Sequence, residues 1–369
     1  MHRRHLPIAI LILMLLIPST VLGQRDFHIG FSTWPYTPTV DAVDETYRFI
    51  AENGDIYLEQ LDDKVPWQEV ASGAPLPEAF AKEINEKVAR RPSHIKLLLA
   101  LTPLNGGRDG IAEAYSGDMP LQLAGKSFND PAVIAAYTTY CQRMIDLFNP
   151  DYLIVGIEVN ELLNNTPDKW PGYVEMSQAV QATLKDVYPD LKTSESVTLH
   201  KLINSETKDV RAYRQQIRDF VADLDLVAVS FYPLFVGHHT HEQFSSAFDL
   251  LREWTDKPLA IAETAHPAET IVAERWNFTF EASPAEQNEY IKVLLERAQS
   301  DEFAYVICFT WRDYDELWGT FPDPVKDLGR LWRDTGFVDE NDVERDAMRT
   351  WRDVLRRRTE ETNSVRQAD

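Results

Sequence analysis

Two stretches of the sequence, about one hundred residues apart, each end an apolar run at a glutamate. Residues 152–161 read YLIVGIEVNE and residues 258–264 read PLAIAET, so Glu161 and Glu263 each close a run. Such runs are typical of parallel strands that helices cover on both faces. Carboxyl groups at the ends of two strands of one α/β barrel meet at its C-terminal face. Two facing carboxyl groups are the minimal equipment for hydrolysis of a glycosidic bond.

We predict different roles for the two glutamates in such a reaction. Retaining hydrolysis needs one carboxyl group that protonates the leaving oxygen and a second that attacks the anomeric carbon. We interpret Glu161 as the acid/base and Glu263 as the nucleophile, with carboxyl groups about 5–5.5 Å apart. Asn160 is expected to bind the sugar 2-hydroxyl, and Glu158, before the predicted strand end, is interpreted as structural. Each glutamate alone is also compatible with a capping or ion-paired role.

Several aromatic residues and a histidine are candidates for substrate contact. Tyr232 follows the apolar run LVAVSF, where its phenol could bind the nucleophile, and Trp311 follows AYVICFT, where its indole could stack on a sugar ring. Trp34 falls in a predicted strand-to-helix loop. His238 opens the sequence HHTH, which we interpret as a polar or sugar-contacting loop.

The same HHTH sequence leaves a metal site open as an alternative. Histidines this close in a loop can bind zinc, and Glu242 directly after His241 could add an oxygen ligand. The spacing matches no established ligand pattern, and the chain has no GxSxG, P-loop or CxxC motif. We therefore expect neither a metal nor a cofactor in the reaction.

Strands and helices alternate along the whole chain after the first residues. Eight segments predict strands, most of them as apolar runs and residues 192–199 by alternation, and a segment with helical periodicity follows each of them. This alternation predicts an α/β fold, a (β/α)₈ TIM barrel, as one catalytic domain over residues 24–369. A doubly wound sheet is the rival, but no glycine-rich turn of the dinucleotide type follows the first strand. The predicted strands are 27–31, 56–58, 95–102, 152–159, 192–199, 226–231, 259–262 and 304–310. The predicted helices are 42–51, 77–90, 131–148, 173–187, 210–222, 241–254, 284–299 and 343–358.

The first 23 residues and the overall charge restrict where the protein works and what it binds. Residues 1–23 combine a basic start, a short apolar run and small residues, which predicts a cleavable signal peptide and a secreted or periplasmic protein. A formal charge of −22 disfavours nucleic acid and anionic lipid as partners. Cys141 and Cys308 are expected to be buried thiols rather than a disulfide. We expect a monomer that is not held at a membrane after signal cleavage.

The residues at the predicted strand ends resemble a known group of enzymes. Asn160-Glu161, Tyr232, Glu263 and Trp311 are similar to the pattern of glycoside hydrolase clan A, the 4/7 barrels. Within this clan, DLVAVSFYPLFVG at 225–237 and AETAHP at 262–267 are most similar to family 53, the endo-β-1,4-galactanases, and DTGFVDEN at 334–341 resembles the tail of clan A enzymes. The resemblance implies a retaining mechanism with Glu161 as acid/base and Glu263 as nucleophile.

The sequence therefore favours a retaining glycoside hydrolase whose substrate is a neutral polysaccharide or oligosaccharide, with β-galactan as a candidate. Two alternatives stay open. A carbohydrate-binding pseudoenzyme of the same fold would bind sugar without cleaving it, and a metal-dependent barrel hydrolase would lose activity with a chelator. Exo and endo action are not distinguished.

Overall fold

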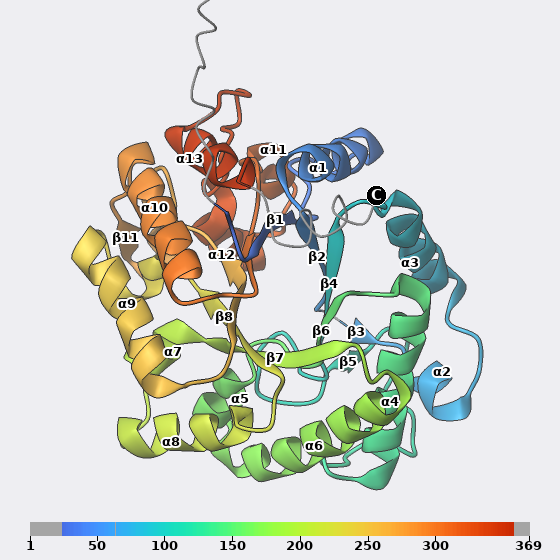
Figure 1. Ribbon diagram of the computed structural model, residues 1–369. Helices are drawn as coiled ribbons and strands as arrows, with labels where there is room; N and C mark the ends of the chain where they lie inside the picture. Colours follow the sequence, from blue (N-terminus) through green and yellow to red (C-terminus); the bar gives the residue numbers. More distant parts are fainter. Residues whose placement is uncertain (1–23, 63, 358–369) are drawn as a thin grey trace, which may run out of the picture.

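Eight parallel strands close into a barrel, and helices surround it (Figure 1). The structure is a computed structural model that describes residues 24–62 and 64–357, so the signal peptide predicted for residues 1–23 lies outside the described residues. Each strand pairs with the next one along the chain, and the last pairs with the first. The barrel strands are β1 (His28–Ser32), β2 (Ile56–Leu61), β4 (Lys96–Leu101), β6 (Tyr152–Ile154), β7 (Lys192–Thr198), β8 (Leu226–Phe231), β9 (Leu259–Thr264) and β12 (Tyr305–Cys308).

A long helix follows each barrel strand and covers the outside of the barrel, so the predicted (β/α)₈ fold is confirmed. Several helix starts are fixed by side chains that accept hydrogen bonds from the first turn, such as Asp130 before α4 and Thr240 before α9. The covering helices are α1 (Val40–Asn53), α3 (Glu78–Arg90), α4 (Pro131–Phe148), α6 (Trp170–Val187), α8 (Val210–Val221), α9 (His241–Trp254), α10 (Pro284–Ser300) and α13 (Asp346–Leu355).

Shorter elements decorate the loops between strands and helices. Two pairs of small strands lie outside the barrel, β3 with β5 and β10 with β11. These strands are β3 (Lys64–Val65), β5 (Glu113–Ala114), β10 (Ile271–Ala273) and β11 (Phe278–Phe280). The short helices are α2 (Trp67–Ser72), α5 (Asn160–Asn165), α7 (Leu199–Ile203), α11 (Asp315–Gly319) and α12 (Asp323–Arg333), with 3₁₀ turns at Pro167–Lys169, Pro233–Val236 and Glu274–Trp276.

Most barrel strands are apolar on both faces, which explains why they read as continuous apolar runs, whereas β7 buries mainly polar side chains. On β9, Ala260 and Ala262 belong to the cluster inside the barrel, whereas Leu259 and Ile261 belong to the larger cluster between the strands and the helices. The barrel interior is filled by side chains from several strands and is therefore a packed core, not a pore. A ligand site must accordingly lie at a barrel mouth.

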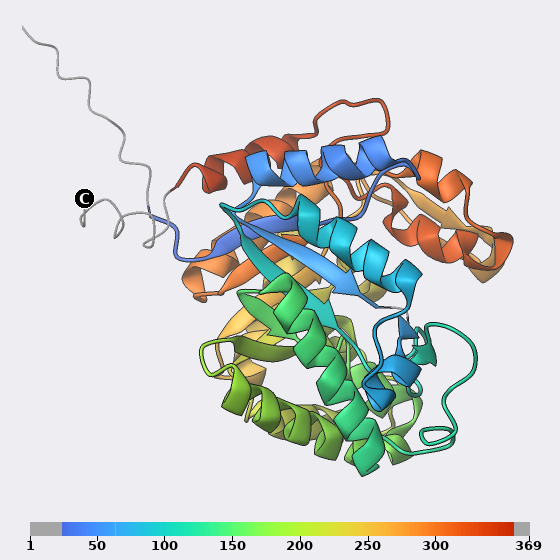
Figure 2. The same cartoon turned by 90° about the vertical axis from the view of Figure 1, so that its right-hand side faces the viewer.

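The carboxyl ends of the strands carry the longest insertions. Residues 102–130 connect β4 to α4, and residues 309–345 connect β12 to α13 and contain α11 and α12. Figure 2 shows the barrel from the side, with the arrowheads of the blue-to-cyan strands pointing toward the end where the orange-red segment with α11 and α12 lies. These insertions form the walls above the barrel mouth.

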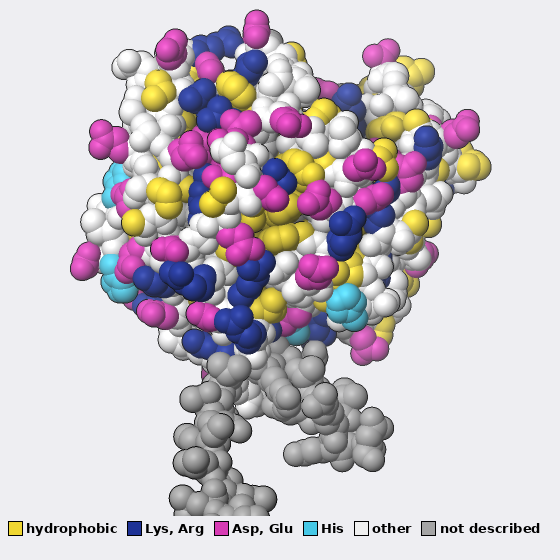
Figure 3. Space-filling view, turned by 90° about the horizontal axis from the view of Figure 1, so that it is seen from above, with side chains coloured by type: hydrophobic (Ala, Val, Ile, Leu, Met, Phe, Trp, Pro, Cys, Tyr) yellow, Lys and Arg dark blue, Asp and Glu magenta, His cyan; other side chains and the backbone are white. Residues whose placement is uncertain are grey.

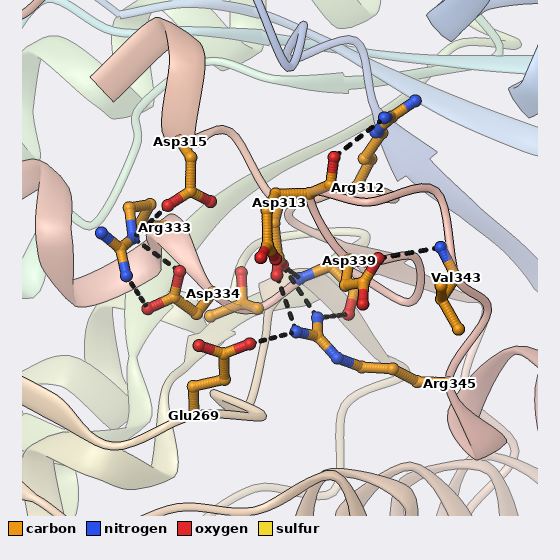
Figure 4. Close-up of polar contacts among 12 residues, drawn as sticks. Glu269, Arg312, Asp313, Asp315, Arg333, Asp334, Asp339, Val343 and Arg345 are labelled. Carbon is orange, nitrogen blue, oxygen red and sulfur yellow. Dashed lines mark hydrogen bonds and ion pairs between the residues drawn. The ribbon is translucent and has the colours of Figure 1, made fainter. Parts of the chain in front are cut away.

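Ion pairs stabilise the insertion after β12 (Figure 4). Both oxygens of the buried Asp313 accept hydrogen bonds from Arg345, at 2.9 and 2.7 Å. Arg333 binds Asp334 through two hydrogen bonds and lies 3.2 Å from Asp315. The loop between β12 and α13 is thus held at both ends by ion pairs, which fixes the segment that carries α12.

The two thiols can be compared with the sequence-based expectation. Cys141 and Cys308 are both free and buried, as predicted. Acidic and basic side chains are interspersed on the face seen in Figure 3, with apolar side chains gathered near its middle. Among residues 24–62 and 64–357, no helix combines the length and the hydropathy that a membrane span requires.

Candidate active site

A pocket with a volume of about 520 Å³ opens at the carboxyl ends of the barrel strands. Four carboxylates line it: Asp62 after β2, Glu158 and Glu161 after β6, and Glu263 on β9. Both glutamates that the sequence singled out therefore lie in one pocket. So many acidic groups in one cavity repel each other, and their protonation states depend on one another.

Glu263 reaches the pocket because β9 is irregular. Val229 of β8 pairs with Ile261, but the next residue, Ser230, pairs with Glu263, so Ala262 is a bulged residue. Strict alternation would turn Glu263 outward together with Leu259 and Ile261. A bulge reverses the alternation beyond it, and the Glu263 carboxylate thereby faces the barrel mouth.

Tyr232 directly follows β8 and donates a hydrogen bond from its phenol to Oε1 of Glu263. The expected contact between this phenol and the Glu263 carboxylate is present. Burial raises the pKa of Glu263, and the nearby charge of Glu158 raises it further, whereas the Tyr232 hydrogen bond lowers it. Tyr232 itself is buried and lines the pocket.

The chain after β6 departs from the prediction, which extended this strand to residue 159. The strand ends at Ile154, and residues 155–159 bend before α5 begins at Asn160. Glu158 has a φ of +54°, a conformation that a glutamate rarely adopts. Its backbone N–H donates a hydrogen bond to Oγ of Ser196 at 2.8 Å, which stabilises this conformation. Uncommon backbone of this kind clusters at active sites.

The bend places Glu158 in the pocket beside a cation. Arg108 lies 3.6 Å from Oε2 of Glu158 and binds both oxygens of Asp62, at 2.7 and 2.5 Å. Burial raises the pKa of Glu158, Arg108 lowers it, and the charge of Asp62 raises it. The charge of Glu158 in turn raises the pKa of Glu263, so Glu158, which the sequence led us to interpret as structural, acts on the predicted nucleophile.

Glu161 lies in the first turn of α5 and also lines the pocket. Its Oε1 accepts a hydrogen bond from Oγ1 of Thr198 at 3.2 Å and lies 3.3 Å from Nε2 of His200. Its other oxygen lies 3.8 Å from Nζ of Lys201. The polar partners of Glu161 thus come from β7 and α7, away from Arg108 and Asp62.

Asn160 does not have the position that binding of a sugar hydroxyl requires. Its side chain is fully buried, and its amide nitrogen donates to the Thr198 carbonyl at 3.1 Å and to the Tyr213 hydroxyl at 2.9 Å. Its amide oxygen accepts from the Thr198 N–H at 2.8 Å. The amide group is therefore used to join α5 to β7, and the expectation for Asn160 is not supported.

Trp311 also lies away from the pocket, contrary to the expectation. Strand β12 ends at Cys308, and the indole turns outward, where it stacks on Phe49 with 4.1 Å between ring centroids. Its Nε1 donates to Oγ1 of Thr46 at 3.1 Å. Trp34, in contrast, lines the pocket as expected and is 36% exposed, with Tyr314 beside it.

The three histidines after β8, His238, His239 and His241, do not converge on one point as a shared metal site would require. His238 is half-buried and does not line the pocket, so sugar contact by His238 is not supported. Nδ1 of His239 lies 3.2 Å from Glu286, and Nδ1 of His241 lies 2.9 Å from Glu289. Within the described part of the chain, the acidic groups spaced for a metal ion are formed by carboxylates at Glu269, Asp313, Asp315, Asp334 and Glu340, without these histidines.

Asp62, Arg108 and His200 are among the polar pocket residues that were not anticipated from the sequence. Arg108 lies in an irregular loop with a φ of +50°, and such loops carry no periodic pattern that would mark it. Its position follows only from the fold, which brings residues 62, 108 and 158 together. A sequence signal existed for Glu158 alone, as a charge within an apolar run.

Comparison with known proteins gives the site its chemical context. The model of the family described as Glycosyl hydrolase family 53 matches residues 129–312, about half of the chain. No curated protein matches the chain significantly. The match spans β6 to β12 and so includes Glu158, Glu161, Tyr232 and Glu263.

Several solved structures share the fold at low identity. The GH53 catalytic domain of Ignisphaera aggregans superposes with a TM-score of 0.58 at 16% identity, over 90% of this chain and 98% of that one. An exo-β-1,4-mannosidase from an Opitutaceae bacterium gives 0.63 at 12% identity, over 92% and 61%. A structure of fungal β-1,4-galactanases gives 0.53 at 13% identity, over 84% and 90%. At such identities these structures support the fold alone.

Residues 129–312 thus match the model of glycosyl hydrolase family 53, and the protein is a glycoside hydrolase.

Proposed function

We propose that this glycoside hydrolase cleaves a neutral polysaccharide or oligosaccharide by double displacement, with Glu263 as the nucleophile. One observation carries the proposal: Glu263 and Glu158 share a pocket at the barrel mouth, and the Tyr232 phenol holds Glu263 by a hydrogen bond. A positioned carboxylate can attack the anomeric carbon and form a glycosyl-enzyme, while a second carboxyl group protonates the leaving oxygen.

Two glutamates compete for the role of proton donor. The sequence predicts Glu161, but the surroundings of Glu158 match the role better. Burial raises the pKa of Glu158, which is what a proton donor requires, and the charge of Glu158 acts on Glu263. Glu161 lies beside Lys201 and His200 instead, which fits a side chain that contacts substrate or supports the pocket wall. We therefore propose Glu158 as the acid/base and retain Glu161 as the alternative.

The substrate proposal rests on charge and on similarity. The net charge of −22 and four pocket carboxylates disfavour a polyanionic substrate such as a uronic acid polymer. The family match and the shared fold with β-1,4-galactanases make β-1,4-galactan the first polymer to test. We further propose that residues 1–23 direct export and that residues 24–369 form one catalytic domain that works as a secreted or periplasmic monomer.

A substrate panel with a stereochemical readout tests the proposal. The purified protein is incubated with β-1,4-galactan, β-mannan, xylan and β-glucan, and with the corresponding nitrophenyl glycosides. Proton NMR of the first product identifies its anomeric configuration before mutarotation. We expect the β-anomer from a β-linked substrate, and Glu263→Gln should abolish the product while the protein remains folded.

Three outcomes would contradict the proposal in different ways. An α-anomer as first product would mean inversion. Sugar binding without any hydrolysis would favour a binding protein of the same fold. Activity that survives in Glu263→Gln but is lost with a chelator would favour metal-dependent chemistry. The sizes of the products report exo or endo action.

A further inference from the structure

One wall of the catalytic pocket is made of exposed apolar side chains on α12. Val325 and Leu328 line the pocket and remain 43% and 45% exposed. Trp34 and Phe235, at 36% and 38%, line the same pocket. Of the large apolar side chains that stay exposed in the described residues, four thus converge on one cavity, although such side chains are ordinarily scattered singly.

The apolar face of α12 has two parts, one attached to the protein and one that lines the pocket. Val325, Leu328 and Leu331 recur at helical spacing and share one face of the helix. Leu331 is buried against Leu234 and Ile271 in a small core beside β10. The C-terminal part of the stripe therefore attaches the helix to the protein, and the N-terminal part continues the same face over the cavity.

The wall is held in place by contacts that do not involve its exposed side chains. The Tyr314 hydroxyl donates to the Gly329 carbonyl at 2.5 Å, and Nε1 of Trp318 donates to the Lys326 carbonyl at 2.7 Å. A Cβ atom at position 329 would come within 2.6 Å of the Phe321 ring, so a larger residue there would displace this ring. The exposed apolar face is thus presented by an anchored helix.

Ion pairs at the end of the helix add to this anchoring (Figure 4). Arg333, the last residue of α12, lies 3.2 Å from Asp315 and binds the buried Asp334. Because the helix is fixed before any ligand arrives, binding to it needs little ordering of the protein, which favours affinity.

The composition of the pocket indicates a ligand with two kinds of surface. The carboxylates, Arg108 and His200 on the floor can bind sugar hydroxyls. Aliphatic side chains such as Val325 and Leu328 offer no hydrogen bond, and burial of a hydroxyl against them without a partner weakens binding. A group rich in CH or aromatic carbon would instead gain from burial there.

Resting on the proposed function, we propose that the α12 wall is a subsite for an apolar aglycone. The enzyme would then accept glycosides whose sugar is linked to an alkyl or aryl group, in addition to neutral glycans. The sugar would lie over the carboxylates, and the aglycone would contact Val325 and Leu328. This assigns a substrate class that neither the family match nor the shared fold specifies.

Ligand pairs that differ only in the aglycone test the proposal. Calorimetry on the Glu263→Gln variant, which cannot turn over, compares methyl and hexyl β-galactosides, and likewise β-glucosides, β-mannosides and β-xylosides. We expect the hexyl ligand of the accepted sugar to bind at least about tenfold more tightly, because several CH₂ groups become buried. The heat-capacity change should also be more negative for the hexyl ligand.

Two wall variants and two controls locate the effect. In the Glu263→Gln background, Leu328→Asn and Val325→Asn should each lower the ratio of methyl to hexyl dissociation constants by several-fold. Leu121→Asn and Val187→Asn make the same changes at positions 93% and 52% exposed that do not line the pocket, and they should leave the ratio unchanged. Circular dichroism checks that all variants are folded.

The results separate this inference from the proposed function. A ratio near one, or a ratio that Leu328→Asn and Val325→Asn do not change, would overturn the aglycone subsite even if the wild type hydrolyses glycans. A high, wall-dependent ratio with no hydrolysis by the wild type would leave the subsite standing and overturn the enzymatic mechanism. Self-association in sedimentation that Leu328→Asn abolishes would make the wall a contact between copies of the chain and would also overturn the inference.

Discussion

Tyr232 and Glu263 leave different strands, β8 and β9, and meet at the barrel mouth, where the phenol donates a hydrogen bond to the carboxylate. The bond stabilises the charged form of a carboxylate that burial and the charge of Glu158 otherwise destabilise. A nucleophile must be ionised when it attacks. Tyr232 therefore has the position to keep Glu263 reactive at a pH where its surroundings favour the protonated form.

Replacement of Tyr232 by phenylalanine should move the acid limb of the pH profile. The lost hydrogen bond had lowered the pKa of Glu263, so the pKa rises and Glu263 becomes ionised only at higher pH. We expect kcat/KM at neutral pH to fall by about 10- to 100-fold, the worth of a hydrogen bond to a charged group. The pH profile of kcat/KM measures the shift. An acid limb that stays in place would mean that Tyr232 does not act through Glu263.

Removal of the nucleophile should allow chemical rescue. In Glu263→Ala, added azide can fill the vacated space and attack the same face of the sugar, which gives a glycosyl azide of inverted configuration. In Glu158→Ala, azide should instead intercept the glycosyl-enzyme and give a product of retained configuration. NMR of the azide products from a dinitrophenyl glycoside measures both outcomes. Exchanged configurations would mean that the two roles are assigned the wrong way round.

The choice between Glu158 and Glu161 as proton donor can be made with leaving groups of different acidity. A donor matters most when the leaving group is poor, so Glu158→Gln should lower kcat/KM on an alkyl glycoside or oligosaccharide by about 10²–10⁴-fold. The loss on a dinitrophenyl glycoside should be much smaller. Glu161→Gln is the matched control, because it makes the same change in the same pocket. The opposite pattern in the two variants would restore the sequence-based assignment of Glu161.

Arg108, the cation beside Glu158, should determine the position of the alkaline limb in the pH profile of kcat/KM. Arg108 lowers the pKa of Glu158, so its removal in Arg108→Met raises this pKa and keeps the donor protonated to higher pH. We expect the alkaline limb of kcat/KM to move to higher pH, with a lower maximum because Asp62 loses its partner. Arg108→Lys keeps the charge and should restore most of the wild-type profile. An unchanged limb in Arg108→Met would exclude Glu158 as the group that titrates there.

The barrel and several pocket residues, among them Tyr232 and Glu263, could be predicted from the sequence because strand signals are local. The apolar runs at 226–231 and 259–262 end next to Tyr232 and Glu263, and both side chains line the pocket as predicted. Covered parallel strands produce such runs regardless of distant partners. The bulge at Ala262 was not foreseen, yet it is what turns Glu263 inward.

The residues that were placed wrongly depend on contacts far along the chain. β6 ends at Ile154, five residues before the predicted end, so Glu158 rather than Asn160 faces the cavity. Trp311 donates a hydrogen bond to Thr46 on α1, a contact that no local pattern around residue 311 reveals. Arg108 lies in an irregular loop and acquires its role only when the barrel brings Asp62 and Glu158 beside it.

A buried carboxyl group outside the pocket should make stability depend on pH. Glu195 on β7 is fully buried, and the hydroxyls of Tyr173 and Ser177 donate to it. Burial raises the pKa of Glu195 to about 7, whereas an unfolded glutamate titrates near 4.3. The folded protein therefore holds a proton that the unfolded chain releases between these values. The free energy of unfolding should fall as pH rises through this window, by up to about 1.4 kcal/mol per pH unit.

Glu195→Gln replaces the protonated carboxyl group by a neutral amide that does not titrate, so this contribution to the pH dependence should disappear. Urea unfolding at pH 5, 6, 7 and 8 measures the difference in free energy of unfolding between the variant and the wild type. That difference should shift in favour of the variant as pH rises, and the shift should level off above the folded pKa. Glu296→Gln, at an exposed position of α10, is the matched control and should give a difference that does not change with pH. A flat difference for Glu195→Gln as well would mean that Glu195 is ionised in the folded protein.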